Sequence, residues 1–139
     1  MNILVIDAQG GGLGKQLITA LKKNFPDMDI TAVGTNTMAT GVMLKAGASH
    51  AATGENAVVV GCRKADIIIG PLAIVIADSM FGEITPAMAL AVAQSNAKRI
   101  LIPFNHCDNI VVGIHDYNVT ALIQEAIEEV TKTLPPRQP

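Results

Sequence analysis

The feature that most constrains the fold is a run of glycines directly after a short aliphatic segment near the N-terminus. Residues 3–6 are all aliphatic, Asp7 ends that run, and Ala8-Gln9-Gly10-Gly11-Gly12-Leu13-Gly14 follows. A short aliphatic run is typical of a buried strand, and so many glycines together are tolerated best in a tight turn. The sequence therefore predicts a strand followed by a glycine-rich loop.

The rest of the chain alternates helical and strand patterns. Apolar residues recur every four positions from Leu13 to Phe25, which predicts an amphipathic helix that ends before Pro26. Further strands are expected at residues 29–34, 49–52, 66–69, 99–104 and 109–114. Further helices are expected at residues 35–46, 55–64, 86–96 and 119–134. The apolar segment 72–82 fits either a short helix or an extended loop.

Strands that alternate with helices predict a parallel sheet with right-handed crossovers. We expect a three-layer, doubly wound α/β fold of Rossmann-like type, with a mostly parallel sheet of about six strands in the order 3-2-1-4-5-6. With three Phe, one Tyr and no Trp, the core must be aliphatic, which suits a parallel sheet between helices. One domain should cover residues 1–134, and residues 135–139 should form a flexible tail.

Composition argues against several classes of partner. The net charge is −2 and aromatic residues are scarce, so a nucleic-acid-binding role is not expected. No signal peptide or run of about 18 apolar residues is present, which favours a cytoplasmic protein without membrane spans. Cys62 and Cys107 form no CxxC motif and are expected as reduced thiols.

Only 16% of the residues are charged, which predicts that some apolar surface is covered by another copy of the chain. Residues 72–93 carry only Asp78 and Glu83 as charged side chains, so we expect this segment to hold a homodimer or larger homo-oligomer together.

In such a sheet, ligands bind outside the carboxyl ends of the strands, at the switch point between strands 1 and 4. The candidate ligand-binding residues follow strands 1, 2, 4 and 5: Gln9, Gly10, Gly11, Gly12, Leu13, Gly14, Lys15, Thr35, Asn36, Gly70, Pro71 and Asn105. The candidate catalytic residues are Asp7, Asp78 and His106. His106 could act as acid, base or ligand, or belong to a hydrogen-bonded turn. Each aspartate could instead cap nearby amides. No metal site is expected.

A glycine loop that opens a helix directs backbone amides and the positive helix end toward an anion. The alternative is a tight turn without a ligand. Gly10 and Gly12 match the first two glycines of GxGxxG, but Lys15 takes the third place. No acidic residue ends strand 2, where Thr35 and Asn36 stand instead, so NAD(P), a mononucleotide and another phosphorylated metabolite all remain candidates.

The loop core also resembles the GGxGK motif of ParA-type ATPases. However, Gln9 replaces the first P-loop glycine and Gln16 replaces the Ser or Thr that binds Mg²⁺, so ATPase chemistry is disfavoured.

A second resemblance rests on five segments, of which the first contains the glycine-rich loop: residues 5–15, 54–60, 77–79, 82–86 and 102–107. Together they resemble a family of short bacterial proteins of unknown function, with a DxQGGGLGK-type loop, over nearly the whole chain. The resemblance implies a Rossmann-like domain and no activity. The leading hypothesis is therefore a protein that binds a nucleotide, dinucleotide or phosphorylated small molecule. The alternative is a non-catalytic regulatory or scaffold protein.

Overall fold

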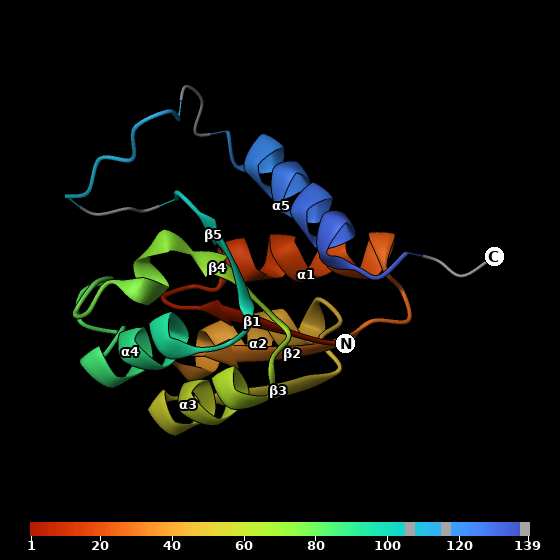
Figure 1. Cartoon of the computed structure of the whole chain (residues 1–139). Helices are drawn as coiled ribbons and strands as arrows, with labels where there is room; N and C mark the ends of the chain where they lie inside the picture. The colour runs from red at the N-terminus through yellow and green to blue at the C-terminus, as the bar shows by residue number, and fades with distance from the viewer. Residues whose placement is uncertain (105–107, 115–117, 137–139) are drawn as a thin grey trace.

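A five-stranded parallel sheet forms the centre of the molecule (Figure 1). The computed structural model describes residues 1–104, 108–114 and 118–136. The strands are β1 (Asn2–Asp7), β2 (Asp29–Gly34), β3 (His50–Thr53), β4 (Ile67–Pro71) and β5 (Lys98–Ile102). Their order across the sheet is β3-β2-β1-β4-β5, and every neighbouring pair is parallel. This confirms the predicted fold class and the order of the first five strands.

Helices cover both faces of the sheet. They are α1 (Gly12–Asn24), α2 (Thr37–Lys45), α3 (Glu55–Lys64), the short 3-10 helix η1 (Leu72–Val75), α4 (Pro86–Gln94) and α5 (Val119–Thr133). Side chains of α1 and α5 fill one apolar core with the odd positions of β1, such as Ile3 and Val5. Leu4 and Ile6 point to the other face, where α3 and α4 pack. This alternation along β1 is the side-chain period of a strand buried on both faces.

The predicted sixth strand at residues 109–114 is wrong. These residues are described and adopt no strand, and Ile110 and Val112 are 89% and 90% exposed. The segment lies away from the sheet in Figure 1, so β5 is an edge strand. Apolar residues alone do not make a strand, because its backbone groups must also pair with a neighbour. The open alternative at residues 72–82 resolves into η1 followed by a series of turns.

Part of segment 72–93 packs in the core. Ile74, Ile84 and Val92 are at most 1% exposed and pack against the face of the sheet that α3 covers. Phe81 and Leu90 remain exposed, at 100% and 56%. The turns after η1 fold part of its aliphatic side chains back onto the sheet, and the expected role of this segment in an oligomer interface stays a prediction.

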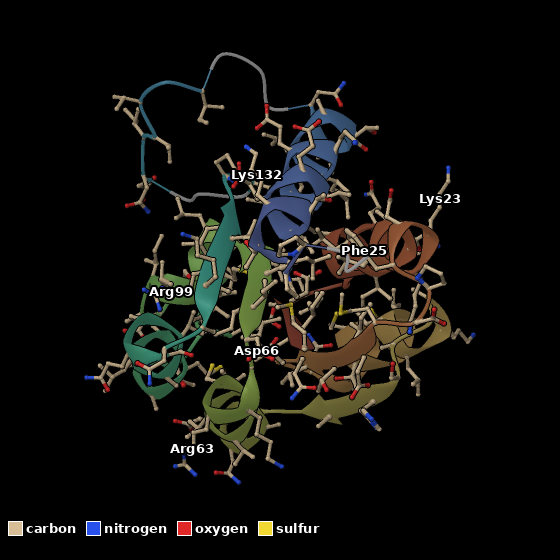
Figure 2. All side chains as sticks on the ribbon, turned by 45° about the vertical axis from the view of Figure 1, so that its right-hand side comes forward. Lys23, Phe25, Arg63, Asp66, Arg99 and Lys132 are labelled. Atoms are coloured by element: carbon tan, nitrogen blue, oxygen red, sulfur yellow. The ribbon has the colours of Figure 1, made fainter. Side chains whose placement is uncertain are left out.

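Charged side chains lie on the outside of this arrangement. Lys23 and Arg63 extend from α1 and α3 away from the sheet (Figure 2). Within the part of the chain that the structure describes, no helix combines the length and the apolar character needed to cross a membrane.

Candidate functional site

The loop between β1 and α1 has an unusual backbone. Gln9 and Gly11 have positive φ angles of 51° and 74°. Gly10, which lies between them, and Gly12, which follows, do not have positive φ angles. The Gly11 amide donates to the carbonyl oxygen of Ala8 at 3.1 Å, which closes a tight turn. Alternation of this kind directs successive amides toward one side, where they form a concave site suited to an anion.

The glycines of this loop have two different roles. A Cβ atom at Gly11 would lie 2.8 Å from the Cα of Ala39 in α2, and its φ is unfavourable for other residues. By contrast, a Cβ atom at Gly10 or Gly12 would meet nothing within 4 Å. The fold therefore requires glycine at position 11, whereas Gly10 and Gly12 leave open space above the loop.

Asp7 holds this loop in place from beneath. Its side chain is 3% exposed, and its oxygens accept hydrogen bonds from the backbone amides of Ala8 at 2.8 Å and Gly14 at 2.7 Å. Burial raises the pKa of Asp7 above its ordinary value, although the two amide bonds lower it, and the nearby charge of Glu83 raises it further. Both carboxylate oxygens are therefore engaged with the backbone, as expected for a residue that caps amides.

Three amides of the same loop have no partner among the residues that the structure describes. Among the described residues, no group accepts a hydrogen bond from the backbone amides of Gly10, Gly12 and Leu13. The first amides of a helix have no partner within the helix, and here α1 receives no side-chain cap at its N-cap residue, Gly11. The N-terminus of α1 therefore offers free donors beside those that Asp7 occupies.

A pocket of about 170 Å³ lies over this part of the loop. Its walls include Gln9, Gly10, Gly11, Gly12, Leu13 and Gln16 from the loop and α1, together with Asp7, Ala8, Pro71, Met80, Phe104 and Val119. Pro71 ends β4 and Asp7 ends β1, so the pocket lies at the point where the strand order reverses. This is the predicted position for a ligand in such a sheet.

Glu83 gathers polar groups at the end of β2. Its Oε1 atom accepts hydrogen bonds from the Gln9 amide at 2.9 Å, the Thr35 hydroxyl at 2.7 Å and the Asn36 side-chain amide at 2.7 Å. The same Asn36 nitrogen also donates to the carbonyl oxygen of Gln9 at 3.0 Å. We call Gln9, Thr35, Asn36 and Glu83 the Glu83 cluster. It joins the loops after β1 and β2 to the turns before α4.

Hydrogen bonds lower the pKa of Glu83. Partial burial acts to raise its pKa, but the donors from Gln9, Thr35 and Asn36 outweigh that effect and lower the pKa below its ordinary value. The sequence alone does not mark Glu83 as a site residue, because it stands two positions before Thr85, the N-cap of α4, where an acidic side chain has an ordinary explanation. No local motif signals a contact made across 74 residues with Gln9.

The structure places the other predicted ligand-binding residues differently. Pro71 lines the pocket, whereas a Cβ atom at Gly70 would lie 2.5 Å from the carbonyl oxygen of Ile6, so Gly70 allows β4 to approach β1. Thr35 and Asn36 belong to the Glu83 cluster, and Asn36 also caps α2 by accepting from the Ala39 amide at 2.9 Å. Lys15 is exposed in the first turn of α1.

Two of the three predicted catalytic residues are described. Asp7 is bound to the loop backbone, and Asp78 is exposed, has a φ of 63° and does not line the pocket. His106 lies outside the described residues, as do the neighbouring Asn105 and Cys107 and the end of the predicted tail, residues 137–139. Their predicted roles stay predictions.

Larger hollows exist elsewhere, away from the glycine-rich loop. One of about 530 Å³ lies between α3 and α4 beside Cys62. Another of about 470 Å³ lies between α3 and the strands β1, β2 and β3. Burial raises the pKa of the Cys62 thiol to about 11, so it stays protonated at neutral pH. In residues 1–104, 108–114 and 118–136, no three His, Cys, Asp or Glu side chains gather as metal ligands would.

Comparison with known proteins identifies the family. The model of a domain of unknown function, DUF3842, matches residues 2–135. The chain belongs to the DUF3842 family. This confirms the resemblance to an uncharacterised family that the loop and the later segments indicated.

Other comparisons add little to the DUF3842 match. No curated protein matches the chain. Among solved structures, a dodecameric FMN-dependent Ubix-like decarboxylase from Escherichia coli O157:H7 is 14% identical to this DUF3842 chain, with 100% of both chains covered and a TM-score of 0.48. The cofactor and the assembly are properties of that protein.

The two roles of glycine in DUF3842 can be separated by substitution. Gly11→Ala should lower the free energy of unfolding by at least about 1–2 kcal/mol, because alanine is disfavoured at positive φ and its methyl group would meet the α2 backbone. Gly41→Ala, in the exposed middle of α2 with nothing near its Cβ, should instead stabilise the chain by about 1 kcal/mol. Urea denaturation of both variants tests this, and equal effects would contradict it.

The lowered pKa of Glu83 predicts a specific dependence of stability on pH. A carboxyl group whose pKa is lower in the folded chain stabilises the fold above its unfolded pKa, and that contribution is lost as the pH falls through the folded value. The difference in unfolding free energy between the wild type and Glu83→Gln should therefore be constant near neutral pH and shrink below about pH 4.5. Denaturation curves that stay parallel down to pH 3 would argue against this assignment.

Proposed function

We propose that the chain binds the phosphate group of a nucleotide or another phosphorylated small molecule on the loop after β1. The observation that carries this proposal is a set of three amides, from Gly10, Gly12 and Leu13, that have no acceptor among the described residues and lie beside the pocket at the N-terminus of α1. Gly10 and Gly12 are exposed, so their amides are accessible to a ligand, and an anion provides an acceptor for them.

Charge at the N-terminus of α1 supports this proposal. The helix dipole favours negative charge there, and Lys15 adds a cation in the first turn. Asp7 already places one carboxyl group at this end, but it uses the amides of Ala8 and Gly14 and leaves the three others free.

The size of the pocket limits what can enter it. At about 170 Å³, it is smaller than the roughly 300–1,000 Å³ of typical small-molecule sites. We therefore assign only the anionic group to this pocket and place the rest of the ligand outside it. A mononucleotide, NAD(P) and other phosphorylated metabolites all satisfy this requirement. Proton transfer by Asp7, Asp78 or His106 is a further part of this proposal.

Replacing Gly12 by valine tests the anion site. The valine side chain would project into open space above the loop, so the fold should persist while the pocket is blocked. A ligand at 100 times its dissociation constant stabilises a protein by about 2.7 kcal/mol, and Gly12→Val should abolish this stabilisation. Thermal shift with inorganic phosphate, AMP, FMN and NAD provides the measurement.

Gly41→Val is the matched control for this substitution. Position 41 is an exposed helical glycine whose Cβ would also meet nothing within 4 Å, but it lies in α2 outside the pocket. Stabilisation by phosphate-bearing ligands should survive in this variant. Equal stabilisation of Gly12→Val and the wild type would place the site elsewhere.

We also propose that the chain forms a homo-oligomer through the segment 108–114. This segment carries Ile110 and Val112, which are 89% and 90% exposed, and it follows β5, the edge strand of the sheet. Exposed aliphatic side chains favour contact with another chain, and a second copy is the simplest partner. This segment is proposed in place of residues 72–93, part of whose apolar side chains pack in the core.

A double substitution, Ile110→Glu and Val112→Glu, should convert an assembly into a monomer without unfolding it, because neither side chain packs in the core. Light scattering should then change from a multiple of 14.5 kDa to that mass. A wild-type chain that is monomeric at micromolar concentration would refute assembly, and an oligomer that survives both changes would refute this location.

A further inference from the structure

A carboxylate stands at the carboxyl end of β2 although no acidic residue follows that strand in the sequence. In dinucleotide-binding Rossmann domains, an acidic residue at this place accepts hydrogen bonds from ribose hydroxyls. Here Thr35 and Asn36 end β2, and Glu83 reaches them from the turns that follow η1. The chain thus places at this site, from a distant segment, the chemical group that is missing locally.

The hydrogen bonds of Glu83 are unevenly shared between its two oxygens. Oε1 accepts from the Gln9 amide, the Thr35 hydroxyl and the Asn36 side chain, whereas Oε2 accepts no hydrogen bond from the described part of the chain. The side chain is only partly buried, so Oε2 remains accessible. Three donors on one oxygen fix the orientation of the carboxylate, and the second oxygen is left as a positioned acceptor.

The Glu83 carboxylate is held by the residue that precedes the free amides of the loop, although Glu83 itself does not line the pocket. Oε1 is 2.9 Å from the Gln9 amide, and the next amide along the chain, that of Gly10, has no acceptor among the described residues. A positioned acceptor and a set of free donors are therefore held by adjacent residues of one loop. A ligand that carries a phosphate and a neighbouring hydroxyl group matches both.

We propose that Oε2 of Glu83 accepts a hydrogen bond from a hydroxyl of the sugar or polyol attached to the bound phosphate, which makes the ligand a sugar phosphate or a nucleotide. This inference rests on the proposed phosphate site. It adds that hydroxyl groups next to the phosphate determine which phosphorylated molecules bind. Phosphorylated molecules without hydroxyl groups should bind no better than phosphate itself.

Glu83→Gln isolates the free oxygen with little change of shape. The three donors around Oε1 require an acceptor, so the glutamine oxygen should take that position and its NH₂ group should replace Oε2. The cluster is then retained, while the charged acceptor becomes a neutral donor. The test measures dissociation constants by calorimetry for ribose 5-phosphate, n-pentyl phosphate and inorganic phosphate. Pentyl phosphate has the same number of carbons as ribose 5-phosphate and no hydroxyl groups.

The wild type should bind ribose 5-phosphate about tenfold or more tightly than pentyl phosphate, as expected for one hydrogen bond to a charged group. Glu83→Gln should remove most of this preference and leave the affinity for inorganic phosphate unchanged within about twofold. Glu125→Gln, which removes an exposed carboxylate from α5, should bind all three compounds as the wild type does.

The outcomes separate this inference from the proposed function. If inorganic phosphate does not bind and Gly12→Val has no effect, the phosphate site itself is wrong. If phosphate binds but ribose 5-phosphate and pentyl phosphate bind equally well, the site stands and the role of Glu83 is overturned. A Glu83→Gln variant that weakens all three compounds equally would make Glu83 a support of the loop, which also overturns the proposed hydroxyl contact.

Discussion

The candidate site depends on the hydrogen bonds that the buried carboxyl group of Asp7 accepts from the loop backbone. Asp7 ends the central strand of the sheet and lies beneath the loop, where burial disfavours its charge. Hydrogen bonds from the Ala8 and Gly14 amides offset part of that cost and at the same time fix the path of the backbone between β1 and α1. The positions of Gly10, Gly12 and Leu13 follow from that path.

Around this centre, apolar packing and polar groups occupy different parts of the molecule. The two apolar cores lie on the faces of the sheet and are built from aliphatic side chains, while the polar groups gather at the carboxyl ends of the strands. Gln9, Asp78, Met80 and Phe81 have positive φ angles, and all four lie in the loops at this end. Unfavourable backbone geometry of this kind is common at ligand-binding and catalytic sites, where the surrounding structure maintains it.

Sequence was informative where contacts are local or periodic. The strand, loop and helix from Ile3 to Phe25 were predictable, because a short aliphatic run, a glycine cluster and a four-residue repeat each have one common structural explanation. The caps of α2 and α4, at Asn36 and Thr85, follow equally local rules. The order of the five strands was predictable only by analogy with the doubly wound pattern that alternating strands and helices indicate, because right-handed crossovers by themselves allow other orders as well.

The errors involve contacts between distant residues. Strand-like residues at 109–114 cannot show whether a neighbouring strand will pair with them, and in this structure none does. Glu83 reaches β2 through turns in which Met80 and Phe81, neither of them glycine, adopt a left-handed backbone. Turn rules based on glycine do not predict such a path, so neither the fold of residues 76–85 nor the carboxylate at the end of β2 could be inferred.

The Glu83 cluster also has a consequence for motion. One oxygen atom links the loop after β1, the start of α2 and the turns before α4, so none of these segments can move far without breaking bonds to the others. They should open and close as a single cooperative unit, less often than three independent loops would. Entry and release of a molecule that touches more than one of them would then be limited by that shared opening rather than by diffusion.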